Sequence, residues 1–395
     1  MAPPPATARG SARRGAAAAA RAKSQASSPS SANSALGYTG SGNSSGRLQI
    51  STSTRPQNAG KNVSRLKMRW AAPASTRVSC ARRPAAAMRV PPSPVPVLLL
   101  CAACGQSTVA APSFDGERAF RDLEHLVSKV GPRRIGTPES AATRTYIRAQ
   151  LEPLGWQFEE DAFVATPPAG ASRSGDIPGV NLLARRPGTE PGAIWIASHY
   201  DTYDMPGFVG ANDAGSSTAL LIELGRQLAG TEPRPGLGIT LVWLDGEERF
   251  LPLPWDDKTN STFGSRHLAE RLKASGDIKQ LEAFILLDMV GDKDLNLLRE
   301  SQSSGWLKEV FERAAYSLGH KQLFGNAMEI KDDHMPFLRA GVPCIDLIDF
   351  SYGPGNKYWH TKDDTLDKVS AGSLGIVGTL VLAALPEVER LAKAR

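Results

Sequence analysis

The sequence predicts a single-domain α/β/α sandwich whose central sheet is mixed, mostly parallel and flanked by helices. Strand-like and helix-like segments alternate through residues 113–395, as expected for such a sheet. The runs at 193–199 and 239–244 are almost entirely apolar, which is typical of strands covered by helices on both faces. Polar residues follow several of these strands, at the edge where open α/β sheets bind their ligands.

Capping residues and apolar periodicity delimit the helices. Apolar residues at helical spacing, among them Leu123 and Leu126, predict a helix over 119–130. Thr137 is a typical N-cap for the next helix, which continues to about residue 154. The other predicted helices span 264–274, 303–319, 332–338 and 370–394, with one more that opens at 210–217 and ends near 228. Pro386 is expected to kink or break the last helix.

Short apolar or alternating runs delimit the strands. Residues 156–165 alternate between apolar and polar side chains, a pattern typical of a half-buried strand. Pro- and Gly-containing loops follow at 167–175 and at 251–262. The remaining strands are predicted at 180–184, 193–199, 239–244, 283–289 and 342–347.

The positive net charge of the chain belongs to its N-terminal arm. Residues 1–114 hold 15 of the 46 Lys and Arg side chains and no acid, which leaves 31 basic side chains beside all 40 acids in the rest of the chain. The body is therefore acidic overall, and we expect no nucleic-acid partner. Cys344 is the only cysteine of the body, so no disulfide is expected within it.

Two segments precede the predicted domain at 113–395. Residues 1–87 are rich in Ala, Ser, Arg, Pro and Gly, and we interpret them as a disordered or non-native extension. Residues 88–104 combine a positive start, a short apolar run and a final cysteine, like a bacterial lipoprotein signal that ends at Cys104. This favours an extracytoplasmic protein, either secreted or held at the membrane by a lipid on Cys104 alone. The alternative is an organelle transit peptide, because 1–87 is Arg- and Ser-rich and acid-poor.

The candidate site residues follow the predicted strands. Glu247 and Glu248 are adjacent at a strand end, so their side chains point in different directions. One carboxylate can then bind a metal ion while the other transfers protons. Each candidate taken alone also has an ordinary role as a helix cap or a surface residue. Together, these carboxylates and imidazoles suit Zn²⁺; they are His199, Asp213, Glu247, Glu248, Asp288, Asp332 and His360.

Through several motifs and their order, the chain resembles the zinc aminopeptidase-like superfamily and, within it, the glutaminyl-peptide cyclotransferases. The resemblance is specific over about 194–367 and looser over the rest of 114–395. It is carried by the motifs His199-Tyr-Asp201, Phe208-Val-Gly-Ala-Asn-Asp213, Asp245-Gly-Glu-Glu248, Gly264-Ser-Arg-His-Leu-Ala269, Leu286-Leu-Asp-Met-Val-Gly291, Asp332-Asp-His-Met-Pro-Phe-Leu338 and Trp359-His-Thr361. Ser198 and Ser217 stand where secreted animal members carry a cysteine pair.

The resemblance implies an enzyme with one Zn²⁺ per chain. It assigns the ion to Asp213, Glu248 and His360, and proton transfer to Glu247. It further places Asp288 and Asp332 in an acid network beside Glu247, and Trp359 and Trp255 in the substrate pocket, with Phe350 or Tyr352 as further apolar wall. The implied reaction converts the N-terminal Gln of peptides or proteins to pyroglutamate and releases ammonia. A monomer is expected.

Two other functions are compatible with the sequence. A two-zinc aminopeptidase of the same superfamily would use His199 and Asp288 for its second ion, and both residues are present. The run Asp332-Asp333-His334 and the Trp359-His360 pair favour the cyclotransferase. A non-catalytic binding protein of the cell envelope would be expected to lack at least one metal ligand or Glu247, and none is missing.

Overall fold

A computed structural model describes residues 113–395, apart from residue 231. The segments predicted at 1–87 and 88–104 lie outside the described residues. The core of the described part is a six-stranded sheet in the order β1-β2-β4-β3-β5-β8. Its strands are β1 (Gln157–Ala165), β2 (Ile177–Arg186), β3 (Ala193–His199), β4 (Gly238–Leu244), β5 (Leu281–Asp288) and β8 (Cys344–Ile348).

The sheet is mixed, as the sequence predicts. β1 pairs with β2 and β2 with β4 in the antiparallel sense. The pairs β3–β4, β3–β5 and β5–β8 are parallel. The carboxyl ends of four neighbouring strands therefore meet at one edge of the sheet, where the segments that carry the candidate site begin.

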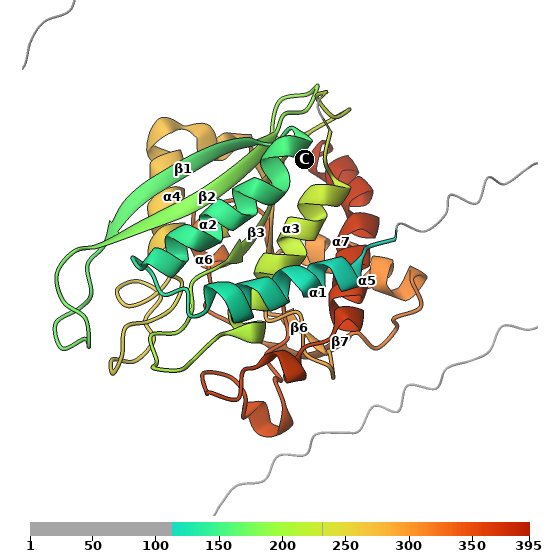
Figure 1. The fold of residues 1–395 in the computed structure, drawn as a ribbon. Helices are drawn as coiled ribbons and strands as arrows, with labels where there is room; N and C mark the ends of the chain where they lie inside the picture. The colour runs from blue at the N-terminus through green and yellow to red at the C-terminus, as the bar shows by residue number, and fades with distance from the viewer. Residues whose placement is uncertain (1–112, 231) are drawn as a thin grey trace, which may run out of the picture. The chain divides into compact units, whose positions relative to one another are not determined.

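Helices cover both faces of the sheet and complete the predicted sandwich (Figure 1). One face packs on α1 (Gly116–His125), α2 (Pro138–Leu151), α3 (Ser217–Gln227), α5 (Gly305–Ser317) and α7 (Ala371–Ala392). The other face packs on α4 (Phe263–Ser275) and α6 (His334–Arg339). Trp243 of β4 is fully buried in the first core, and Phe284 of β5 in the second. Short 3-10 or π turns lie at Leu126–Val130, Glu152–Leu154, Ala211–Ser216, Asp277–Gln280, Pro354–Asn356 and Leu366–Lys368.

Pro386 was expected to kink or break the last helix, and the expected break is wrong. α7 continues through Pro386 to Ala392. Val388 and Ala392, beyond the proline, are buried in the core, and this burial stabilises the last turns. α7 is long and apolar enough to cross a membrane, but half of its apolar window is buried inside the domain. Leu374, Val377 and Val381 of α7 lie in the first core.

The sequence reading missed a second sheet. β6 (Leu297–Glu300) and β7 (Phe324–Met328) form a parallel pair beside β8. These strands have only four and five residues. Short strands without regular alternation give almost no periodic signal.

The Ser198 hydroxyl donates a hydrogen bond to the Ser217 hydroxyl at 2.9 Å, so these two buried residues are in direct contact.

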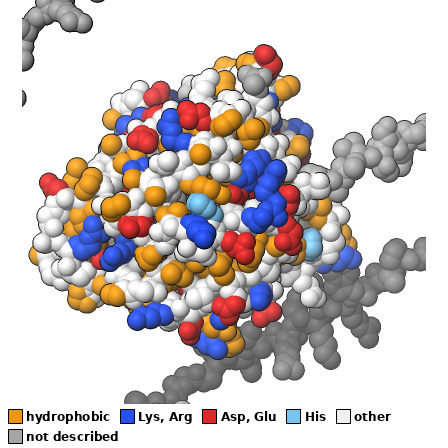
Figure 2. All heavy atoms as spheres, viewed as in Figure 1, with side chains coloured by type: hydrophobic (Ala, Val, Ile, Leu, Met, Phe, Trp, Pro, Cys, Tyr) orange, Lys and Arg blue, Asp and Glu red, His pale blue; other side chains and the backbone are white. Residues whose placement is uncertain are grey.

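On the face that carries α1, α2 and α3, acidic and basic side chains lie side by side (Figure 2). Arg226 pairs there with Asp122. That face carries mixed charge.

Two glycines of α7 provide a test of the packing. A Cβ at Gly378 would lie 2.3 Å from the Phe114 ring, whereas a Cβ at Gly372 would meet only the Ser370 hydroxyl at 3.8 Å. Gly378→Ala should destabilise the domain by about 1–3 kcal/mol through overpacking. Gly372→Ala should stabilise it by about 0.5–1 kcal/mol, because alanine loses less backbone entropy in a helix. Chemical denaturation measures both, and equal effects would contradict the packing.

Candidate active site

The carboxylate of Asp201 positions the glutamate pair. Asp201 follows β3, and the pair follows β4, the parallel neighbour of β3. Oδ1 of Asp201 accepts a hydrogen bond from the backbone amide of Glu247 at 3.1 Å, and Oδ2 accepts one from the backbone amide of Glu248 at 3.2 Å. Its Oδ1 also lies 3.4 Å from Nδ1 of His199. One buried side chain thus fixes the backbone of both glutamates and contacts the imidazole of His199.

Asp213, Glu248 and His360 form one group of converging donor atoms. Nε2 of His360 lies 3.1 Å from Glu248 Oε2 and 3.3 Å from Asp213 Oδ2. Oε1 of Glu248 is buried without a hydrogen-bond partner among the described residues, and Oε2 has only the His360 imidazole beside it. Buried unpaired carboxylate oxygens are costly, and a bound cation offsets that cost. Two carboxylates and one imidazole that leave a coordination position open are a donor set that suits catalytic Zn²⁺.

His199, Asp213 and Asp288 form a second such group, which shares Asp213 with the first. Nε2 of His199 lies 3.3 Å from an oxygen of each aspartate. All three side chains are buried. The structure therefore brings together both ligand sets predicted from the sequence.

Asp364 positions the backbone of Asp213. The Asp364 carboxylate accepts hydrogen bonds from the backbone amides of Asn212, at 2.8 Å, and Asp213, at 3.1 Å. The Tyr352 hydroxyl donates to the same carboxylate at 2.7 Å. Tyr352 is fully buried in this role and does not line the pocket, so the alternative that it forms the pocket wall is wrong.

Aromatic rings fix the orientation of His360. Its ring stacks on Tyr203 on one side, at 3.7 Å between centroids, and on Trp359 on the other, at 4.0 Å. Phe208 contacts its edge. An imidazole held between two rings loses little further freedom when it binds a metal ion, and this favours a preformed site.

Sequence reasoning missed four positioning residues. Asp201 and Tyr203 lie in or next to the His199 motif, and Asp364 lies four residues after His360. The fourth, Arg133, is fully buried and donates to the carbonyls of Tyr200, Val209 and Gly210. It thereby holds both ends of the loop that leads from β3 to Asp213. Asp201, Asp364 and Arg133 act through backbone groups, and Tyr203 acts through a ring stack with His360. Neither kind of contact leaves a pattern in a sequence.

Glu247, Asp288 and Asp332 border one pocket. Burial raises the pKa of the Glu247 carboxyl well above its ordinary value; His199 opposes this shift and Asp332 adds to it. Burial likewise raises the pKa of Asp332, and the charge of Asp288 adds to the effect. Burial also raises the pKa of Glu248, to about 7. Such shifts are typical of groups that exchange protons or bind cations.

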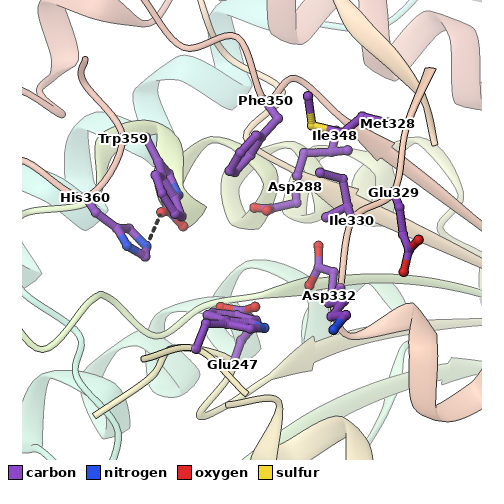
Figure 3. A pocket seen from close by; sticks show the side chains of 13 residues that line it. Glu247, Asp288, Met328, Glu329, Ile330, Asp332, Ile348, Phe350, Trp359 and His360 are labelled. Carbon is purple, nitrogen blue, oxygen red and sulfur yellow. Dashed lines mark ion pairs between the residues drawn. The ribbon is translucent and has the colours of Figure 1, made fainter. Parts of the chain in front are cut away.

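The pocket has a volume of about 480 Å³ and a mixed lining. Figure 3 shows Glu247, Asp288 and Asp332 around its acidic side, and Phe350, Ile348 and Ile330 on its apolar side. The dashed line in Figure 3 marks the pair of His360 with Asp213. Trp359 and Trp255 both line the pocket, at the place the sequence predicts.

Comparison with known sequences identifies the family. The sequence model of Peptidase family M28 matches residues 181–385. The chain belongs to this family. Within it, the chain belongs with the glutaminyl-peptide cyclotransferases. It is 32% identical over 286 residues to the glutaminyl-peptide cyclotransferase of Gloydius blomhoffii. The aligned residues make up 61% of this chain and 74% of the relative. It is 29% identical to that of Drosophila melanogaster, over 69% of this chain and 83% of the relative.

Solved structures agree with this assignment. The glutaminyl cyclase of an Acidobacteriales bacterium is 39% identical and superposes with a TM-score of 0.66, covering 72% of this chain and 98% of that one. The glutaminyl cyclase of Porphyromonas gingivalis is 29% identical with a TM-score of 0.61, covering 69% and 98%. A Zn-dependent exopeptidase from Parabacteroides distasonis, 24% identical with a TM-score of 0.60 over 71% and 99%, shares the fold.

Asp201→Asn tests whether the Asp201 carboxylate organises the site. The substituted amide cannot accept both backbone N–H groups, so the glutamate pair should lose its fixed position. Metal affinity, measured by chelator competition, should fall about 10–100-fold, as is typical when a group that supports metal ligands is lost. Asp204→Asn is the control, because Asp204 lies in the same loop but pairs with Arg134. Equal metal affinity in the two variants would contradict this role.

Proposed function

We propose that the chain is a zinc-dependent glutaminyl-peptide cyclotransferase, which converts the N-terminal Gln of peptides and proteins to pyroglutamate and releases ammonia. The observation that carries this proposal is the convergence of Asp213, Glu248 and His360 beside Glu247 at one pocket. The relatives named glutaminyl-peptide cyclotransferase support it.

Asp213, Glu248 and His360 would hold one zinc ion. When bound there, zinc would polarise the side-chain carbonyl of the substrate Gln as a Lewis acid. Asp201 and Asp364 fix the backbone of the two acidic ligands, and Tyr203 and Trp359 fix the imidazole. The ligands are therefore held in place by the protein before any ion binds.

Glu247 would transfer the proton. Ring closure forms a bond between the α-amino nitrogen and the side-chain amide carbon of Gln, and it breaks the bond from that carbon to the amide nitrogen. Glu247 takes a proton from the attacking amine and returns it to the departing ammonia. Burial raises the pKa of Glu247, which brings its proton affinity closer to that of the amine.

The walls of the pocket would hold the reactive conformer of the substrate. Both reacting groups belong to one residue, so the barrier falls mainly through orientation. Trp359 and Trp255 line the same pocket as the acids, and Phe350 meets Trp359 edge-on at 4.8 Å between ring centroids. These rings would exclude water, which would otherwise compete with the amine.

A two-metal aminopeptidase is the second candidate, because His199 and Asp288 form a complete second donor group with Asp213. The named relatives favour the cyclotransferase. A non-catalytic envelope protein is disfavoured, because Glu247, Asp213 and His360 line one pocket and Glu248 converges on the last two. We further propose a monomer that acts outside the cytoplasm, without a nucleic-acid partner and with Cys104 as its only membrane attachment; residues 88–104 lie outside the described part of the chain.

Two peptides distinguish the candidates. A Gln-initiated peptide should lose the mass of one ammonia, and a Leu-initiated peptide of otherwise equal sequence should stay intact, as mass spectrometry would record. Release of free leucine would contradict the cyclotransferase and support the aminopeptidase.

The two glutamates should differ in their effect on metal binding. Glu247→Gln should lower kcat by a factor of at least about 100, since general base catalysis contributes 10²–10⁴-fold, and leave zinc content unchanged. Glu248→Gln should lose zinc, because a neutral amide is a poor ligand for it. Elemental analysis after gel filtration measures the ion. Loss of zinc from the Glu247 variant alone would show that the two roles are exchanged.

A further inference from the structure

The mouth of the pocket borders an open strand edge. β7 has a single hydrogen-bonded neighbour, β6, among the strands of residues 113–395. Asn326, Ala327 and Met328 of β7 are exposed. The chain then continues through Glu329, Ile330 and Lys331, which line the pocket, to Asp332 in its acidic part. An open edge therefore leads directly into the candidate active site.

The backbone of this segment alternates between its two edges. The Met328 carbonyl accepts the Ser301 amide at 2.9 Å, and the Ile330 amide donates to Glu300 at 3.2 Å, so both face β6. In an extended chain the N–H and C=O of the residue between them point the opposite way. Glu329 is that residue, and its backbone N–H and C=O have no partner among the described residues. They are available to an incoming chain.

The side chains alternate in the same way. Figure 3 shows Met328 and Ile330 on the pocket side of the segment and the Glu329 carboxylate directed away from it. Met328 is 45% exposed, and only Val164 and Tyr316 are comparable large apolar side chains within the described part. A methionine at the mouth of a binding pocket is an adaptable apolar contact.

We propose that this edge binds the substrate residues that follow the N-terminal one, as an added antiparallel strand. The inference rests on the proposed function, which places the first residue of the substrate beside Glu247 in the pocket that Asp332 also lines. The substrate chain must then run outward from Asp332 toward β7, opposite to the direction of β7 itself. Strand addition of this kind draws its affinity from main-chain hydrogen bonds and its specificity from alternate side chains.

The register follows from the spacing of the segment. With the first substrate residue level with Lys331, the second lies opposite Ile330 and the third opposite Glu329. The third residue then exchanges both of its main-chain hydrogen bonds with Glu329. Residues opposite each other share one face, so the second residue packs with Ile330 and the fourth with Met328 on the apolar side. The ligand class is an extended polypeptide with apolar second and fourth residues.

Methylated substrates test this proposal on the unmodified protein. Three tetrapeptide amides are compared: glutaminyl-phenylalanyl-alanyl-leucine amide, its analogue N-methylated at the third residue, and its analogue N-methylated at the fourth. Methylation at the third residue removes the donor to Glu329 and should lower kcat/KM about fivefold or more, mainly through KM. Methylation at the fourth residue affects an amide that points away, and the change should stay below about twofold.

The proposal would be overturned if both methylated peptides lost kcat/KM equally, if the peptide methylated at the fourth residue lost more, or if neither lost any. Calorimetric binding of the same three peptides keeps it separate from the proposed function, because a chain that releases no ammonia would still show the affinity difference if the strand edge binds peptide. The edge could instead pair with β7 of a second copy. Peptide affinity would then fall as protein concentration rises, and this result would also overturn the proposal.

Discussion

The carboxylate of Asp201 is the interaction on which the candidate site depends. β3 and β4 are parallel neighbours, with His199 level with Leu244, so the segments that follow them leave the sheet side by side. Asp201 joins these segments by accepting the amides of both Glu247 and Glu248. Hydrogen bonds to a charged group are worth about 1.5–3 kcal/mol each. With both amides fixed, the two glutamate side chains diverge, and the pair can serve a metal ion and a proton separately.

Buried neighbours also hold the other two donor residues. The three residues of the first donor group come from distant parts of the chain, and each is held by a buried neighbour. Asp364 fixes Asp213 through two amides, and the rings of Tyr203 and Trp359 enclose His360. The site gathers several buried carboxylates, and burial raises the pKa of those at Glu247, Glu248 and Asp332. A cation at Glu248 would offset part of this electrostatic cost, which links folding of the site to metal binding.

The sequence predicted the sandwich and the donor residues because both leave local patterns. Apolar strands such as 239–244 and helix caps such as Thr137 are readable without a structure, and Thr137 does cap α2. The donors were found because they follow strands in an order shared with a known family. β6 and β7 were missed because they are too short to show a period, and the break expected at Pro386 was outweighed by burial on both sides. Asp201, Asp364 and Arg133 were missed because they bind main-chain groups, which only the fold brings to them.

The position and number of bound zinc ions decide between the cyclotransferase site and a two-metal site. Crystals grown with zinc and measured at the zinc absorption edge locate every ion by its anomalous scattering. We expect one peak, bounded by Asp213, Glu248 and His360, with no second peak at His199 and Asp288. Two peaks that share Asp213 as a bridge, or a single peak at His199 and Asp288, would contradict it.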